Sequence, residues 1–283
     1  ILFGLKHPAI LKFVCYSPVD FKNKPKPVII TEFAENRSLY DLIEMERESH
    51  AHKDWNDTTK FIILYGIATA MSFLHSQKIV HRDLKPSNIL LDSHLHPKLA
   101  DFGLSKIIHK NKQSMTTQSI VGQKGTYVYM APEIWNEKPV YSEASDVYAF
   151  GMIMYEVLTN EQPFNDLTSN QSDETPLITT LANKIQSGER PSFKYEILEP
   201  LQYLIKSCWD QDPTKRPSFM NIMEQLENDQ ELRNFDLFDE DEYQNYIDFI
   251  QDYNDQIKFI KTPGFDISKY IVSKEDNFKT ITI

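Results

Sequence analysis

Apolar residues recur at helical spacing through much of the chain after residue 56. One apolar face is formed by Phe61, Leu64, Tyr65, Ala68 and Met71. This face predicts a helix over residues 57–76, with Asp57 or Thr58 as the N-cap. Residues 145–159 are apolar nearly all round, which predicts a buried helix. Further helices are expected at about 177–187, 199–210 and 217–228.

Short apolar runs bounded by turn residues indicate a few strands. Residues 1–33 contain "HPAILKFVCYS" and "VIITEF", which we expect to form two buried strands joined by a hairpin-like loop. The segments "NILL" and "KLAD", on either side of the turn "DSHLH", predict a small hairpin at residues 88–101. Because strands are few and helices many, the pattern favours an α+β fold dominated by helices.

Two polar segments interrupt this pattern. Residues 105–126 are rich in Ser, Thr, Gln and Lys and show no hydrophobic period, so we expect a long loop of the kind that is usually functional. Residues 165–180 are also polar, and whether this segment docks a partner or only loops out is left open.

The composition becomes acidic after residue 228. The acidic residues between 228 and 257 are Asp229, Glu231, Asp236, Asp239, Glu240, Asp241, Glu242, Asp248, Asp252 and Asp255. Apolar residues nonetheless keep helical spacing from Tyr243 to Ile257, which predicts an amphipathic helix that ends before "PG" at 263–264. Two interpretations remain open, a solvated tail or helix packed on the domain, and an interaction arm.

Composition limits the classes of function. With 283 residues, of which 41% are hydrophobic, the chain is long enough to bury one large core or two smaller ones. The net charge of −11 argues against nucleic-acid and anionic-membrane partners. Cys15 and Cys208 are far apart in apolar contexts, so we expect a reducing, cytoplasmic location. No apolar run is long enough to span a bilayer, and because the chain starts with Ile1 we expect a fragment.

Three residues in "IVHRDLKPSNILLDSHLHPKLADFGLSK" suit phosphoryl transfer. Asn88 and Asp101 carry oxygen ligands of the type that Mg²⁺ prefers, and the intervening hairpin brings them together. Asp83 is placed to accept the hydrogen bond of a substrate hydroxyl and to orient it. Each residue alone is as well explained by an ordinary loop or cap.

The motifs taken together are specific. "HRDLKPSN", then "DFG", then "APE" at 131–133 occur in the order of a kinase catalytic loop, metal loop and activation segment. The sequence resembles the eukaryotic protein kinase family over residues 1 to about 228. "CWDQDPTKRPSF" is similar to the tyrosine-kinase-like group, whereas the lysine in "HRDLKPSN" matches the serine/threonine form. The resemblance implies a protein-kinase-like fold and transfer of the ATP γ-phosphoryl group to a Ser or Thr hydroxyl of a protein substrate.

The resemblance also divides the chain and assigns a nucleotide site. Residues 1–33 would be a remnant of the β-rich small lobe, residues 34–228 the large lobe, and residues 229–283 an acidic tail. Asp83, Lys85, Asn88 and Asp101 are the implied catalytic residues, with Asn88 and Asp101 holding Mg²⁺. The implied ATP contacts are Thr31 as gatekeeper, Glu32 and Ala34 through their backbones, Ser38 near the ribose, and Leu90 under the adenine.

Supporting roles follow from the same resemblance. Asp146 is expected to brace the catalytic loop, and Glu133 to pair with Arg216. An apolar column between the lobes is expected from Leu2, Phe13, His81 and Phe102. Arg82 suggests activation by phosphate on the loop, with Ser114, Thr116, Thr117 and Ser119 as candidates, and Thr126 is expected in the substrate-facing floor.

Part of the kinase machinery is missing from these residues. The chain has no G-x-G-x-x-G, and its first lysine, Lys6, lies past the position of the small-lobe lysine that would pair with a glutamate. We therefore expect residues 1–283 alone to have little activity and to expose an unpaired sheet surface. A pseudokinase-like binding module is the alternative to a kinase, and reading the coding frame upstream of Ile1 separates the two.

Overall fold

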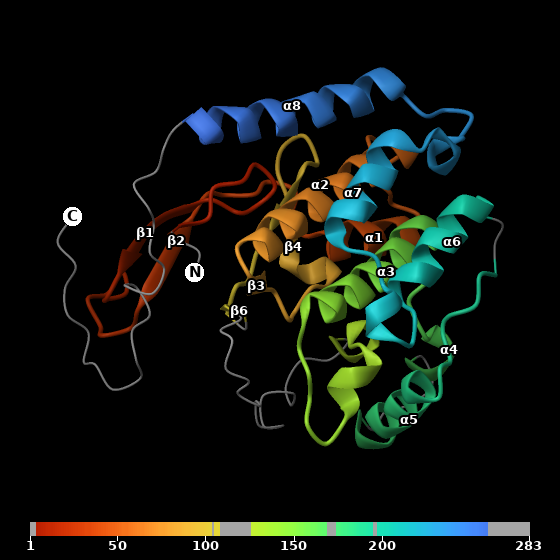
Figure 1. Ribbon diagram of the computed structural model, residues 1–283. Helices are drawn as coiled ribbons and strands as arrows, with labels where there is room; N and C mark the ends of the chain where they lie inside the picture. The colour runs from red at the N-terminus through yellow and green to blue at the C-terminus, as the bar shows by residue number, and fades with distance from the viewer. Residues whose placement is uncertain (1–3, 104, 108–125, 169–173, 195–196, 260–283) are drawn as a thin grey trace.

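The computed structural model describes residues 4–103, 105–107, 126–168, 174–194 and 197–259. In these ranges helices predominate, and the short strands form three separate two-stranded sheets (Figure 1). The predicted α+β class is therefore confirmed. Leu2 and the four candidate phosphorylation sites between 114 and 119 lie outside the described residues.

Two long helices form the centre of the molecule. Helix α2 (Asp57–Ser76) is buried on nearly all sides, as is α3 (Glu143–Thr159), which confirms both helix predictions. The predicted N-cap of α2, Asp57 or Thr58, was wrong by one or two residues. Asn56 is the cap, because its side-chain oxygen accepts the Thr59 N–H at 2.9 Å.

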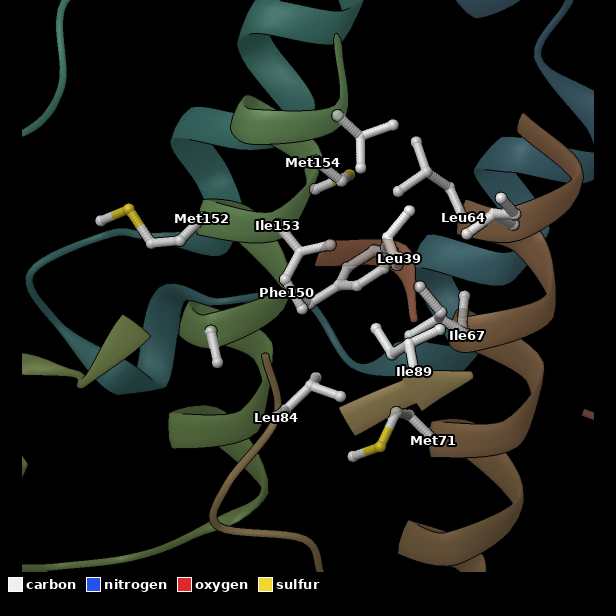
Figure 2. Close-up of a cluster of buried hydrophobic side chains, with 14 of the residues drawn as sticks. Leu39, Leu64, Ile67, Met71, Leu84, Ile89, Phe150, Met152, Ile153 and Met154 are labelled. Atoms are coloured by element: carbon white, nitrogen blue, oxygen red, sulfur yellow. The ribbon is translucent and has the colours of Figure 1, made fainter. Parts of the chain in front are cut away.

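The core between these helices supports the segment that carries the catalytic motif. Figure 2 shows apolar side chains of α2 and α3 meeting Leu39 of α1 (Leu39–Arg47). Leu84 and Ile89 enter the same cluster, and both are buried. Since Leu84 follows Asp83 and Ile89 follows Asn88, packing fixes the backbone on both sides of the expected catalytic loop.

Smaller helices complete the large helical region. These are α4 (Asn165–Thr168), α5 (Glu174–Gln186), α6 (Glu199–Cys208) and α7 (Phe219–Asn228). Helix α6 packs on α3, and α7 packs on α2. The predicted helices at 177–187, 199–210 and 217–228 are confirmed, although α5 begins three residues earlier than expected.

Two of the sheets lie beside the catalytic segment. The predicted hairpin is present as β4 (Ile89–Leu91) and β5 (Pro97–Leu99), which pair antiparallel. Strand β3 (Ile79–Val80) precedes the catalytic motif and pairs with β6 (Lys106–Ile107). The β3–β6 pair thereby joins residues before and after "DFG", and the β4–β5 hairpin ends shortly before it.

The third sheet corrects the sequence interpretation of residues 1–33. Strands β1 (Phe13–Ser17) and β2 (Val28–Thr31) pair antiparallel, as expected, but they are not buried. Val14 is 56% exposed, and Ile29 is 61% exposed. The reason is that, in the described residues, the two strands form a sheet of their own rather than the interior of a larger one. This agrees with the expected exposure of an unpaired sheet surface.

The acidic segment contains a packed helix. Helix α8 (Glu240–Phe259) lies across α2, as Figure 1 shows, and confirms the predicted helical spacing. Its inner face is formed by the buried side chains Tyr243, Tyr246, Ile247 and Ile250. Gly66 permits this close approach, because a side chain there would overlap Pro97 of β5 and the Tyr246 hydroxyl.

Among the described helices, none combines the length and the apolar character that crossing a bilayer requires.

Candidate active site

The loop before Asp83 is held by one buried carboxylate. Asp146, in the first turn of α3, is 2% exposed. Its Oδ2 accepts the His81 N–H at 2.8 Å, and its Oδ1 accepts the Arg82 N–H at 2.9 Å. The ring of His75, from the last turn of α2, lies 3.0 Å from Oδ2. These contacts hold Arg82 at a φ of 73°, a strained conformation directly before Asp83.

Asp83, Lys85 and Thr126 form a compact polar cluster. The Lys85 Nζ lies 2.9 Å from Asp83 Oδ2 and donates to Thr126 Oγ1 at 3.1 Å. Asp83 and Lys85 are both buried, so their charges interact in a medium that screens them less than water does. The structure thus brings together two expected catalytic residues and Thr126, the residue expected in the substrate-facing floor. Lys85 and Thr126 are 41 positions apart in the chain.

Asn88 joins this cluster and faces the hairpin. Its amide nitrogen donates to the Asp83 carbonyl at 2.7 Å and to Asp83 Oδ2 at 2.9 Å. The Asn88 carbonyl accepts the Ala100 N–H at 2.8 Å, which places Asp101 next to Asn88 across the β4–β5 ladder. Asp101 is exposed and has a φ of 56°, and its Oδ1 accepts the Gly103 N–H at 3.1 Å.

These two residues fit a magnesium ion. The Asn88 amide nitrogen is directed at Asp83, which leaves Oδ1 as the ligand atom, and Asp101 offers an exposed carboxylate. In the described residues, no group of three or more His, Cys, Asp or Glu side chains is placed to hold a metal. Two oxygen ligands with the rest supplied by water and phosphate is the usual arrangement for Mg²⁺.

The "DFG" segment is tied to the catalytic loop by ring contacts. The rings of His81 and Phe102 meet edge to face at 5.3 Å, and His81 Nε2 lies 3.0 Å from the Ala100 carbonyl. Burial lowers the pKa of His81, so its ring is neutral at pH 7. The contact agrees with part of the expected apolar column, whereas the contribution of Phe13 stays a prediction.

The residues expected to hold adenosine lie on the connection between β2 and α1 and on β4. Thr31 ends β2, and the Glu32 N–H donates to the Lys12 carbonyl at 2.9 Å. Ser38 caps α1 through a capping box with Asp41 and forms a β-bridge with Leu90. The structure therefore brings Ser38 and Leu90 together, whereas Ala34 lies half-buried in the loop between β2 and α1.

The ion pair implied by the resemblance is formed. Arg216 Nη1 donates to Glu133 Oε1 at 2.7 Å, and Nη2 donates to Oε2 at 2.9 Å. Further hydrogen bonds from Arg216 reach the carbonyls of Ala144 and Asp210, both at 2.9 Å. This bidentate pair connects the segment after Thr126 to the start of α3 and the loop after α6.

Arg82 has surroundings that the sequence did not indicate. Its guanidinium lies over the ring of Tyr141 at 5.2 Å, and burial lowers its pKa. Pairing of Arg82 with phosphate on the loop stays a prediction, because residues 108–125 are outside the described part of the chain.

Sequence reasoning missed a buried network beneath the expected substrate floor. Thr126 and Tyr129 share a 3₁₀ turn, and the Tyr129 hydroxyl donates to Glu156 of α3. Glu156 Oε1 accepts a hydrogen bond from Arg47 Nη2 of α1 at 2.8 Å. Burial raises the pKa of both Glu156 and Tyr129. The signal was the single glutamate in the apolar run "MIMYEVLT", whose burial requires a partner.

Comparison with known proteins agrees with this geometry. A model of the protein kinase domain family matches residues 1–226. The chain is 35% identical to the serine/threonine-protein kinase VIK of Arabidopsis thaliana, covering 80% of this chain and 48% of that protein. It is 34% identical to the serine/threonine/tyrosine-protein kinase HT1 of Arabidopsis thaliana, with coverage of 80% and 52%.

A third relative comes from another organism. The chain is 35% identical over 199 residues to the RGS domain-containing serine/threonine-protein kinase A of Dictyostelium discoideum, covering 70% of this chain and 16% of that protein. The chain thus spans about half the length of these relatives or less.

Proposed function

The chain belongs to the protein kinase domain family, and from this premise we propose that it is the catalytic part of a protein serine/threonine kinase. The single observation that carries the proposal is the position of Lys85 Nζ, within 3.1 Å of both Asp83 Oδ2 and Thr126 Oγ1. A carboxylate that can orient a substrate hydroxyl and a cation that can contact the phosphate thus lie together beside the expected substrate floor. Transfer of a phosphoryl group to a hydroxyl requires such positioning.

The proposed mechanism assigns one task to each residue. Asp83 accepts the hydrogen bond of the substrate Ser or Thr hydroxyl and orients its oxygen toward the phosphate. Lys85 forms an ion pair with the Asp83 carboxylate and contacts the transferred phosphate. Thr126 holds Lys85 from the side of the activation segment.

ATP and Mg²⁺ are the proposed cofactors. Asn88 and Asp101 would hold the ion, which when bound neutralises charge on the phosphate oxygens. Asn88 also links the ion site to the base, since its amide donates to Asp83. Thr31, Glu32, Ala34, Ser38 and Leu90 are proposed to hold the nucleoside, and the proximity of Ser38 to Leu90 supports this.

Two further features support the proposed setting. Cys15 is exposed as a free thiol, which favours a reducing, cytoplasmic compartment. The net charge of −11 favours protein substrates over nucleic acid.

Replacement of the two key carboxylates tests the proposal in the natural protein that contains residues 1–283. Asp83→Asn removes the hydroxyl-orienting charge and Asp101→Asn removes a metal ligand, so each should lower kcat by about 10²–10⁴-fold. The measurement is ATP-dependent phosphorylation of a serine peptide, with thermal unfolding to show that each variant remains folded. Asp236→Asn, an exposed change outside the site, is the control.

Two results would count against this assignment. Turnover retained in both variants would refute the roles of Asp83 and Asp101. Absence of turnover in the unmodified natural protein, with nucleotide binding intact, would favour the pseudokinase-like binding module.

A further inference from the structure

A groove lies where α8 crosses α2 and the turn of the β4–β5 hairpin, outside the residues assigned to phosphoryl transfer. Its volume is about 400 Å³. The residues that line it include Ile62 of α2, His96 of the hairpin turn, and Asp239, Asp241, Glu242 and Phe249 from α8 and the residue before it. Its character is therefore apolar on one side and acidic on the other.

The apolar side presents an aromatic ring to solvent. Phe249 is 48% exposed and stacks on His96, with the ring centres 6.3 Å apart. His96 in turn lies 4.6 Å from the ring of the buried Tyr246. Burial lowers the pKa of His96, so its ring adds no positive charge at pH 7.

The acidic side includes two carboxylates that form no ion pair among the described residues. Asp239 accepts the Glu242 N–H at 2.9 Å and thereby caps α8, and Glu240 pairs with Arg233 at 3.3 Å. Asp241 and Glu242 have no cationic partner among the described residues, and no lysine or arginine is among the described residues that line the groove. Both carboxylates lie in the first turn of α8, where they also interact favourably with the helix dipole.

We propose that this groove docks a basic, extended segment of a partner protein. A Lys or Arg of the segment would pair with Asp241 and Glu242, and an apolar side chain would cover Phe249. Charge complementarity favours this occupant, because the chain carries a net charge of −11 and one side of the groove is formed by Asp239, Asp241 and Glu242. The docking does not depend on phosphoryl transfer, so it can be tested independently of the proposed kinase activity.

The helix geometry sets the spacing in the partner. Glu242 and Phe249 are seven positions apart on α8, which is about 10 Å along a helix. An extended chain covers that length in about three residues. The basic and apolar residues of the docked segment should therefore lie three positions apart.

A labelled peptide tests this spacing directly. The probe is a fluorescein-labelled octapeptide, G-R-R-G-G-L-L-G, and binding to the natural protein is followed by fluorescence anisotropy without nucleotide. Control peptides replace both arginines with glutamine or both leucines with glycine. We expect each control to bind at least about fivefold more weakly, and the affinity of the probe to fall at high salt as charges are screened.

Matched variants of the protein locate the binding site. Asp241→Asn with Glu242→Gln, and separately Phe249→Ala, should each weaken probe binding at least about fivefold. Glu231→Gln with Asp236→Asn changes the same charge outside the groove, and Leu237→Ala removes a more accessible apolar side chain, 91% exposed. These controls should alter affinity less than about twofold.

Three outcomes would overturn the proposal. The first is probe affinity unchanged by the groove variants, and the second is an equal loss in the control variants, which would indicate general charge attraction. The third is equal binding of the peptide without leucine. None of these results bears on catalysis, because the assay contains no phosphoryl transfer.

Discussion

At the scale of single residues, Glu156 shows how a buried charge connects distant parts of the chain. Its side chain is 1% exposed inside α3, and it accepts hydrogen bonds from Arg47 and Tyr129. Arg47 also donates through Nε to the Asn160 carbonyl at 3.0 Å. The carboxylate therefore ties α1, which Ser38 caps beside Leu90, to the 3₁₀ turn that contains Thr126.

Removing the cation should make stability depend on pH. Arg47→Met leaves Glu156 buried without its positive partner, and we expect a loss of roughly 3 kcal/mol in the free energy of unfolding at about pH 8. Because Arg47 lowers the pKa of Glu156 against the effect of burial, the variant should have a still higher folded-state pKa. Stability is then retained at low pH, where Glu156 is protonated, and lost as pH rises through that pKa.

Urea unfolding at about pH 5 and about pH 8 measures this effect. The loss relative to the parent should be smaller at the lower pH, and Lys22→Met, an exposed change, should show no such difference. An equal loss at both pH values would mean that Arg47 acts by packing alone.

The proposed catalytic residues and this network differ in how well sequence predicts them. Asp83, Asn88 and Asp101 lie close together in two adjacent motifs, "HRDLKPSN" and "DFG", so their types and spacing alone indicated the chemistry. The contact of Arg47 with Glu156 spans 109 positions, and nothing local in either helix specifies it. The same holds for Lys85 with Thr126, which only the assembled fold brings together.

At the scale of elements, α8 is a layer of the core and not a free tail. Tyr243 is 1% exposed, and its hydroxyl donates to the Leu226 carbonyl of α7 at 3.0 Å. Its ring makes edge-to-face contacts with Phe61 and Tyr65 of α2 at 6.2 and 5.9 Å. One side chain of α8 thus packs against two other helices, which supports the interpretation of this segment as a helix packed on the domain.

Truncating this side chain should destabilise the whole domain. Tyr243→Ala removes a buried ring and leaves a cavity between α2, α7 and α8, so we expect the free energy of unfolding to fall by about 3–5 kcal/mol. Tyr203→Ala on α6, where the side chain is 74% exposed, should cost less than about 0.5 kcal/mol. A loss of under about 1 kcal/mol for Tyr243→Ala in chemical unfolding would show that α8 contributes little to the core.

Sequence periodicity predicted the elements better than their surroundings. The pattern of apolar residues identified α2 and α8 by a face at helical spacing, and α3 by apolar residues nearly all round. It overestimated the burial of β1 and β2, since apolar strand residues look alike whether or not another layer covers them. It also gave no indication that α8 would reach Gly66, whose missing side chain makes room for Tyr246.

At the scale of the whole molecule, residues 1–283 carry only part of the proposed active site. The described residues supply the proposed base, the proposed ion ligands and their supports, whereas residues 1–283 contain no G-x-G-x-x-G and no lysine at the expected phosphate-binding position before Lys6. Thr31, one of the proposed nucleoside contacts, ends β2, and the side chains of Val14, Tyr16 and Ile29 on β1 and β2 are exposed. A sheet surface of this kind favours association in solution.

We therefore predict that residues 1–283 produced alone phosphorylate a serine peptide at a rate at least about 100-fold below that of an intact kinase domain, because half of the phosphate contacts are absent. Radiolabel transfer from ATP measures the rate, and the Asp83→Asn form of the same residues gives the background. Turnover well above this background, at the rate of an intact domain, would show that the phosphates are held in another way.

The carboxylate of Asp146 has a further consequence for how the chain folds. Its partners His75, His81 and Arg82 precede it by 71, 65 and 64 positions, so its hydrogen bonds close only after α2, the catalytic loop and α3 have met. Before that moment, withdrawing the charge from water is costly, which opposes premature collapse around α3. Contacts of such long range form slowly. The expected catalytic loop should thus be among the last parts of the domain to reach its native conformation. A partly folded chain should therefore be inactive.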